Sequence, residues 1–90
     1  MKKLWHDRAW DEYLAWQGRD RKTIRRINQL LTSIERNGCA CIGKPEALKG
    51  NWSGWWSVRI DDANRIIFRI APDHIEIASC AGHYCDSPLM

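Results

Sequence analysis

The sequence has few of the features that define several large protein classes. Its apolar runs are only a few residues long, far short of the ~20 that a membrane-spanning helix needs. Charge returns directly after Leu4-Trp5, so no signal peptide is expected. Repeats, low-complexity stretches and linkers are missing as well. The 90 residues therefore predict a single domain over residues 1–90 that has no membrane partner and acts in the cytoplasm.

Motifs for the commonest cofactor and metal chemistries are also missing. The chain lacks a glycine-rich phosphate loop, a Ser-His-Asp pattern and a carboxylate cluster that would hold magnesium. Its cysteines are Cys39, Cys41, Cys80 and Cys85. One residue separates Cys39 from Cys41, which is shorter than structural zinc sites use, and no export signal favours disulfides. We expect free thiols, no metal site and no cofactor.

Two abundant residue types leave alternatives open. Six tryptophans are many for a chain of this length. They fill a small core, or some of them form a surface for a partner or for base stacking. Residues 19–26 hold several arginines and a lysine against Asp20 alone. This run is either a solvated helix face or a surface for an anionic partner such as nucleic acid.

The first part of the chain predicts a strand and a helix. Residues 3–6 form a short candidate strand. Asp7 is a plausible N-cap for a helix over residues 8–17, in which Trp10 and Leu14 are expected to be buried at i,i+4 spacing.

A second helix follows, which Asp20 caps and Asn37-Gly38 ends. Its apolar residues recur every three or four positions and form the stripe Ile24, Ile27, Leu30, Leu31 and Ile34. Residues 38–54 then read as a loop, and a loop of this length in so small a domain is often functional.

The period changes to two in the last part of the chain. Strands are expected at residues 55–60, 65–71 and 75–84, with turns at residues 61–64 and at Pro72-Asp73. The order β-α-α-β-β-β predicts an α+β domain, with an antiparallel sheet and both helices packed on one face. The helical stripe should cover the apolar side of the strands, and the other face should be at least partly open to solvent.

Polar residues gather in the long loop and at the strand ends. They are Glu46 and Lys49, with Lys44 nearby, then Arg59, Arg65 and His83-Tyr84. One carboxylate, one imidazole and several cations are sufficient for metal-free phosphodiester transfer, in which a base takes the 2′-OH proton and an acid protonates the departing 5′-oxygen. Taken singly, a loop glutamate is usually solvated, and an edge-strand arginine usually guards against aggregation.

These residues lie in segments that resemble the YoeB/Txe toxins of the RelE superfamily, which are ribosome-dependent mRNA interferases of bacterial toxin–antitoxin pairs. The segments that carry the resemblance are Lys3-Leu4-Trp5, residues 10–17, Gly43-Lys44-Pro45-Glu46-Ala47-Leu48-Lys49, residues 53–60, Asn64-Arg65-Ile66-Ile67-Phe68 and His83-Tyr84. They cover nearly the whole chain in order. Residues 85–90, expected to be a flexible tail, and residues 37–42 depart from the family pattern.

The resemblance implies catalytic roles for four residues and binding roles for two. Glu46 matches the general base, His83 the general acid, Arg65 the residue that stabilises the phosphorane and Tyr84 a substrate-positioning residue, while Lys49 and Arg59 match accessory cations. The implied partners are a YefM-like antitoxin, the bacterial ribosome with its mRNA and operator DNA through the antitoxin only, and a homodimer is allowed. The antitoxin is expected across the basic groove near Lys49, Arg59 and Arg65.

Two other functions stay open beside the endoribonuclease. One is a DNA-associated regulatory subunit that acts only through its antitoxin, and the other is a small RNA-binding module. The Glu46 and His83 pair favours the enzyme, because a protein that only binds has no need of an acid and a base.

The pairing of the last two strands raises a question about His83. The expected partners are Ile70 with Ile75, Arg69 with Glu76 and Phe68 with Ile77. Unbroken alternation would then send His83 to the face opposite Arg65, although an acid and its phosphorane-stabilising arginine must share one face. Either the hairpin register is shifted by one residue, which spoils the apolar pairing, or the last strand bulges before His83. We predict the bulge, for which Gly82 is the natural place.

Overall fold

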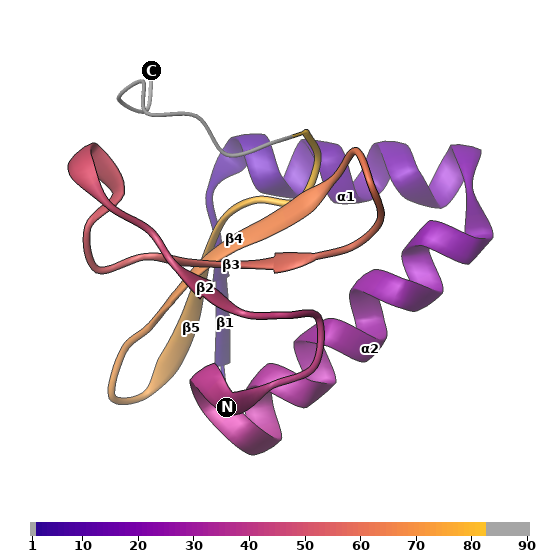
Figure 1. Ribbon diagram of the computed structural model, residues 1–90. Helices are drawn as coiled ribbons and strands as arrows, with labels where there is room; N and C mark the ends of the chain where they lie inside the picture. Colours follow the sequence, from indigo (N-terminus) through magenta and orange to yellow (C-terminus); the bar gives the residue numbers. More distant parts are fainter. Residues whose placement is uncertain (1, 83–90) are drawn as a thin grey trace.

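The computed structural model describes residues 2–82, and Figure 1 shows their path. The elements are β1 (Lys2–Trp5), α1 (Asp7–Arg19), α2 (Arg21–Asn37), the short 3-10 helix η1 (Gly38–Ala40), β2 (Glu46–Ala47), a second 3-10 helix η2 (Gly50–Trp52), β3 (Trp56–Arg59), β4 (Arg65–Ile70) and β5 (His74–Ser79). The predicted α+β class is confirmed. Within the described residues, no helix is long and apolar enough to cross a membrane.

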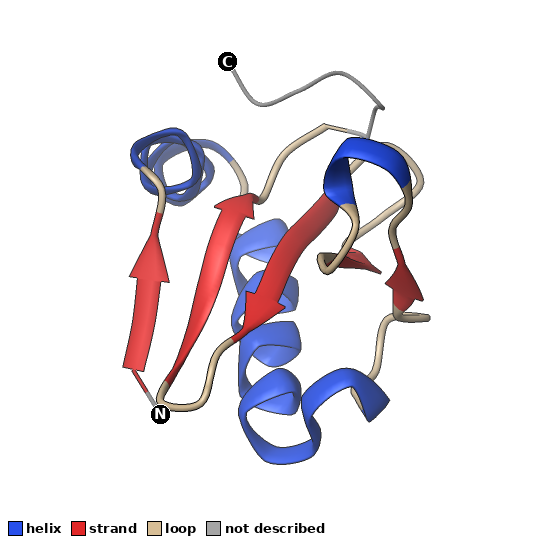
Figure 2. Ribbon diagram, turned by 90° about the vertical axis from the view of Figure 1, so that its left-hand side faces the viewer, coloured by secondary structure: helices blue, strands red, loops and turns tan. Residues whose placement is uncertain are grey.

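The five strands form one sheet in the order β1-β5-β4-β3-β2. β1 runs parallel to β5, and the other neighbours are antiparallel. The predicted antiparallel sheet is therefore wrong for this one pair, because β1 and β5 come from opposite ends of the chain and no hairpin turn sets their relative direction. Figure 2 shows α2 running behind the strands.

α1 begins one residue earlier than expected and presents a different face to the sheet. His6, not Asp7, stands at its N-cap position and makes no side-chain cap bond. Ala9 and Trp16 are buried, whereas Trp10 and Leu14 are each 44% exposed, so the expected burial of the latter pair is wrong. The indole Nε1 of Trp16 donates to the carbonyl of Cys80 at 3.0 Å, which fixes the rotation of the helix.

α2 follows the prediction closely. The Asp20 carboxylate accepts hydrogen bonds from the backbone of Lys22 and Thr23, and Gly38 ends the helix with φ +59°. The stripe contributes to a core with residues of β3, β4 and β5, although Ile24 is only half-buried. The members of this core that come from the stripe and the strands are Ile27, Leu30, Leu31, Ile34, Val58, Ile66, Phe68, Ile75 and Ile77.

The other face of the sheet carries a second, smaller cluster. Leu48, Trp52 and Trp55 from the segment between β2 and β3 pack on Ile67 and Ala78 of β4 and β5. This face is therefore covered at one end, and the charged residues described below lie beside that cover.

The register between β4 and β5 confirms the three expected pairs and then shifts by one residue. Ile67 pairs with Ser79, so Ala78 is the extra residue and the bulge lies there rather than at Gly82. A residue distant in sequence holds the chain just after the bulge: the Glu12 carboxylate accepts from the Cys80 backbone at 2.9 Å and from the Ser79 hydroxyl at 3.1 Å. β5 therefore ends at Ser79 and not at residue 84.

Candidate functional site

The segment that leads to Glu46 is held against β3 by its backbone. Gly43 has φ +93°, and its carbonyl accepts from Arg59 N at 2.8 Å. A Cβ at Gly43 would lie 2.6 Å from Leu30 Cδ2, so only glycine lets this segment pass so close to the core. Lys44 follows with φ +53° and is the one non-glycine residue with positive φ among residues 2–82. Strain of this kind persists where the surroundings impose it.

Ser57 lies next to both Glu46 and Arg65 on one face of the sheet. Glu46 on β2 lies directly opposite Ser57 on β3, so the two side chains share a face of the sheet. Arg65 Nη1 donates to Ser57 Oγ at 3.0 Å, and Ser57 is 1% exposed. The structure thus brings Glu46 and Arg65 to one face of the sheet, and Glu46 is exposed there.

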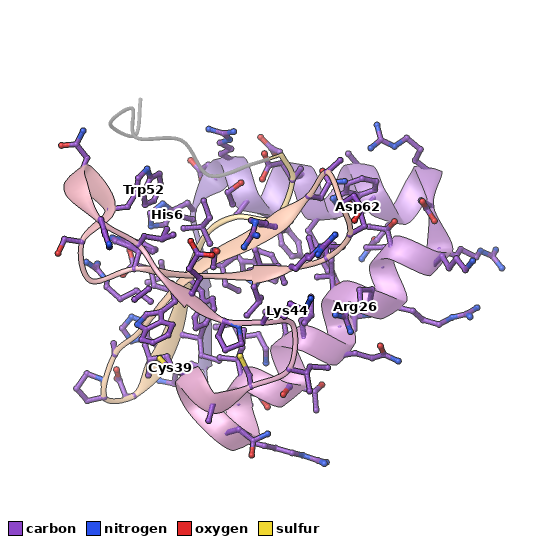
Figure 3. All side chains as sticks on the ribbon, in the orientation of Figure 1. His6, Arg26, Cys39, Lys44, Trp52 and Asp62 are labelled. Carbon is purple, nitrogen blue, oxygen red and sulfur yellow. The ribbon has the colours of Figure 1, made fainter. Side chains whose placement is uncertain are left out.

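Arg59 lies in the same row of the sheet. It is directly opposite Arg65 in the ladder and forms an ion pair with Asp62 in the β3–β4 turn. From the other side, Arg26 of α2 donates to the Arg59 carbonyl at 3.3 Å. Figure 3 shows Arg26 and Asp62 toward one end of the molecule and Trp52 and His6 toward the other.

Lys49 stands where the chain turns over the second cluster. It follows the buried Leu48, and its carbonyl accepts from Trp52 N at 3.2 Å. Lys49 is exposed to solvent. Lys49 therefore lies beside the second cluster, next to Leu48, which packs with Trp52 and Ile67.

His83 and Tyr84 lie outside the described residues, as does the predicted tail at residues 85–90, but the backbone before them is fixed. Gly82 has φ +79°, its carbonyl accepts from Arg65 N at 3.0 Å, and its N–H donates to Asn64 Oδ1 at 2.9 Å. The chain therefore enters the predicted His-Tyr segment directly beside Arg65.

A network of His6, Glu76 and Arg69 contacts the second cluster at Trp55. Glu76 accepts from His6 Nε2 at 2.7 Å and from Arg69 Nη2 at 2.6 Å, and these bonds hold the pKa of its carboxyl below the ordinary value. The Arg69 guanidinium lies 4.5 Å from the centre of the Trp55 ring, and His6 meets the edge of the same ring. The network thus ties Trp55, and the segment it anchors, to β4 and β5.

The described cysteines do not belong to this face. Cys39, Cys41 and Cys80 are free thiols. Burial raises the pKa of the Cys39 and Cys41 thiols, and burial beside the Glu12 carboxylate raises that of Cys80 to about 12. Within residues 2–82, no cluster of three or more His, Cys, Asp or Glu side chains could hold a metal ion.

Four residues with a part in this geometry were not predicted as site residues. They are Glu12, Lys44, Ser57 and Asn64. Ser57 had a weak signal, because it alternates with Arg59 on the polar side of its strand. Glu12 gave no such signal in the sequence, since its partners lie at the other end of the chain.

The arrangement places a carboxylate, a guanidinium and further cations around an exposed patch, which suits a phosphodiester.

Comparison with known proteins gives one family. Residues 5–84 match the family described as "YoeB-like toxin of bacterial type II toxin-antitoxin system". The chain is 40% identical over 84 residues to Toxin YoeB of Escherichia coli (strain K12), covering 93% of this chain and 100% of that protein. It is 45% identical over 76 residues to Toxin RelK of Mycobacterium tuberculosis, covering 84% and 89%.

Solved structures of toxins from the same family are also similar to this chain. A YoeB/ParE toxin from Agrobacterium tumefaciens superposes with a TM-score of 0.90 at 37% identity, over 93% of this chain and 100% of that one. The toxin in a heterotetrameric YoeB-YefM complex from Staphylococcus aureus gives 0.87 at 41% identity, over 93% and 98%.

Proposed function

The chain belongs to the YoeB-like toxins of bacterial type II toxin–antitoxin systems, and from that premise we propose that it is an endoribonuclease that cleaves mRNA on the bacterial ribosome, in the cytoplasm and without a metal ion. The observation that carries the proposal is that Glu46 and Arg65 share one face of the sheet, where Glu46 lies opposite Ser57 in the ladder and Arg65 donates to the Ser57 hydroxyl. A carboxylate and a guanidinium on one face support the proposed pairing of a base with a phosphate-binding cation.

The proposed reaction is a transfer within the RNA strand. Glu46 takes the proton from a ribose 2′-OH, and the oxygen attacks the adjacent phosphorus as the bond to the 5′-oxygen breaks. His83 gives a proton to that 5′-oxygen, which leaves a 2′,3′-cyclic phosphate on one fragment and a 5′-hydroxyl on the other. Tyr84 positions the substrate.

The cations stabilise the charge that develops on phosphorus. A guanidinium has five N–H donors, so Arg65 can keep its bond to Ser57 and still donate to the non-bridging oxygens. Arg59, which lies opposite Arg65 in the ladder, and Lys49, which lies beside the second cluster, attract the backbone on either side of the cleaved bond. Ser57 acts through Arg65 as a positioning residue.

The proposed partners follow from the solved relatives. The Staphylococcus aureus proteins are described as a YoeB-YefM complex and as a YoeB dimer. We propose that this chain likewise binds a YefM-like antitoxin, across the basic groove near Lys49, Arg59 and Arg65, and contacts operator DNA only through it. A homodimer is the second assembly proposed.

Cleavage of mRNA on purified ribosomes in EDTA tests the proposal. Wild type should cut, whereas Glu46→Gln and His83→Gln should each lose about 10²–10⁴-fold in single-turnover rate, the usual contribution of a general acid or base. Asp11→Asn, an exposed carboxylate of α1, is the matched control and should cut like wild type. Rates within tenfold of wild type for both glutamine variants would reject the assigned roles. A wild-type protein that binds ribosomes but never cuts would favour the non-catalytic alternative.

A further inference from the structure

The turn between β3 and β4 reaches across to the end of the described chain through the side chain of Asn64. Its Oδ1 accepts from the backbone N–H of Gly82 at 2.9 Å. The next residue, Arg65, donates its own backbone N–H to the Gly82 carbonyl at 3.0 Å. Two consecutive residues therefore hold both backbone polar groups of Gly82, directly before the predicted His83-Tyr84 segment.

The Asn64 amide fits the groups on both of its sides. Its Nδ2 donates to the Asp61 carboxylate, at 3.0 Å and 3.2 Å from the two oxygens, so its Oδ1 faces the Gly82 N–H. An asparagine side chain supplies donors at one end and an acceptor at the other, as a carboxylate and an N–H require. An aspartate here would bring a second negative charge against Asp61, and an alanine would make neither bond.

The turn is closed by other hydrogen bonds. The backbone carbonyl of Asn64 accepts from Ile60 N at 2.9 Å and from Asp61 N at 3.3 Å. The Asp61 carboxylate also accepts from Ala63 N at 2.8 Å. These bonds lie within residues 60–64, whereas the bond from Gly82 spans 18 residues of sequence. The Asn64 Oδ1 therefore acts on the chain at Gly82 and not on the turn.

Hydrogen bonds, and not packing, fix the backbone at Gly82. Gly82 is exposed, has φ +79°, and an added Cβ would meet no described atom within 4 Å. Two residues earlier, Cys80 is buried, and its backbone N–H and carbonyl are both bonded to side chains of α1. The chain thus leaves a packed anchor at Cys80 and depends on Asn64 and Arg65 for its direction two residues later.

We propose that Asn64 is a positioning residue for the cleavage step, which directs the His83-Tyr84 segment so that His83 reaches the departing 5′-oxygen beside Arg65. The inference rests on the proposed function for the role of His83. Asn64 acts through Gly82 and not on the substrate. Because a catalytic group that is misplaced by about 1 Å can lose 10²-fold in rate, the loss of this bond should be visible in cleavage.

A sulfur leaving group separates this role from a structural one. In an mRNA with a 5′-bridging phosphorothiolate at the cut site, the 2′-oxygen attacks phosphorus as before, and the P–S bond breaks to release a thiolate. A thiol has a much lower pKa than an alcohol, so this group leaves without a proton and cleavage no longer needs the general acid. A variant that misplaces only the acid should therefore be slow on the oxygen substrate and normal on the sulfur substrate.

Single-turnover cleavage on purified ribosomes is measured with both mRNAs, after the cut site has been mapped on the oxygen substrate. Asn64→Ala should cut the oxygen substrate about 10–100-fold more slowly than wild type, and the sulfur substrate within about threefold. His83→Gln should show the same pattern with a larger loss on oxygen, about 10²–10⁴-fold.

Two further variants serve as controls. Ser57→Ala acts through Arg65, which stabilises charge on phosphorus in both reactions, so it should be slowed equally on the two substrates, roughly tenfold. Asn28→Ala is the matched control, because it removes an exposed asparagine whose Oδ1 accepts from the Tyr13 hydroxyl at 2.8 Å. It should cut both substrates like wild type.

Amide hydrogen exchange at Gly82 gives a readout that does not depend on cleavage. In Asn64→Ala, the Gly82 N–H loses its acceptor and should exchange about fivefold faster. The Cys80 N–H, which Glu12 holds, should keep its wild-type rate and so report that the variant is folded. Asn28→Ala should change neither rate.

Three results would overturn the inference. They are an Asn64→Ala variant that cuts the oxygen substrate like wild type, one that is slowed equally on oxygen and sulfur, and one whose Gly82 amide exchanges at the wild-type rate. The proposed function fails separately. If sulfur does not restore His83→Gln, His83 is not the acid, and if wild type cuts neither substrate, the chain is not an endoribonuclease. In both cases the Gly82 exchange rate still decides whether Asn64 holds the segment.

Discussion

The two faces of the sheet are built for different tasks. The helix-covered face buries a continuous apolar core, in which Ile27, Leu30 and Phe68 are 0% exposed. The opposite face has a small apolar cluster at one end. Beside this cluster lie the exposed Glu46 and the half-buried Arg65, which donates a hydrogen bond to Ser57. The comparison teaches that one face supplies most of the stability, which leaves the other able to hold charged groups in fixed positions.

The largest effect on stability should come from the helix-covered face. Phe68→Ala removes a side chain that is fully buried between α2 and the sheet, and should lower the free energy of unfolding by about 3–5 kcal/mol. Urea denaturation measures this, and Ile67→Ala, its neighbour on the opposite face, should cost less, about 2 kcal/mol. An equal or larger loss for Ile67→Ala would break the comparison.

A second prediction concerns Gly43, where the segment before Glu46 meets the helix-covered core. Gly43→Ala puts a Cβ 2.6 Å from Leu30 Cδ2 at φ +93°, and should cost about 2–3 kcal/mol from strain and contact together. Gly54 is the matched control, because it has φ +92° and no atom within 4 Å of an added Cβ. Gly54→Ala should therefore show the backbone strain alone, about 1–2 kcal/mol. Equal losses in the two variants would show that the approach to Leu30 carries no cost.

Periodicity in the sequence predicted most of the helix-covered face. The α2 stripe and its Asp20 cap depend on residues close in sequence, and both are confirmed. The predicted buried face of α1 was wrong, because apolar residues lie on two sides of this helix. The hydrogen bond from the Trp16 indole to the Cys80 carbonyl selects the side that faces the core. The antiparallel prediction was wrong for β1. This strand pairs with β5 from the other end of the chain, so no local turn sets the direction of the pair.

The opposite face was only partly predictable. Alternation required a bulge before His83, and the structure has one, but at Ala78. The position is set by Glu12, which is 68 residues from its partner Cys80 in sequence. Likewise, a serine in a strand gives little sign that it will lie opposite Glu46 and accept a hydrogen bond from Arg65. The roles of the six site residues stay predictions.

A third prediction tests whether the Ser57 hydroxyl affects mRNA cleavage separately from its effect on stability. Ser57→Ala removes the acceptor of Arg65 Nη1 and should cost about 1 kcal/mol of stability, with roughly tenfold slower mRNA cleavage as Arg65 loses its orientation. Thr23→Val is the control, since it removes one hydrogen bond at the start of α2. It should destabilise to a similar degree without slowing cleavage by the folded protein. If the two variants lose cleavage equally, the effect belongs to stability and not to position.

The smallest expected effect is a pH dependence of stability, which comes from the His6, Glu76 and Arg69 network beside Trp55. His6 and Arg69 hold the pKa of Glu76 below its ordinary value of 4.5. Because the folded pKa is the lower one, the carboxylate contributes stability that is complete above the ordinary value and is lost as pH falls through the folded value. Glu76→Gln should therefore cost roughly 0.5–1 kcal/mol at pH 7, and the difference from wild type should shrink as pH falls from about 5 to 3.

Urea denaturation across that range measures the difference, and Asp11→Asn on the exposed side of α1 controls for the removal of one negative charge. Wild type and Glu76→Gln curves that stay parallel from pH 7 to 3 would show that the ionised carboxylate adds nothing. Since Arg69 stacks on Trp55 while it pairs with Glu76, a difference that shrinks on acidification would assign part of the stability of the Glu46-bearing face to charge. The helix-covered face, held by apolar contacts, should show no such dependence at Phe68.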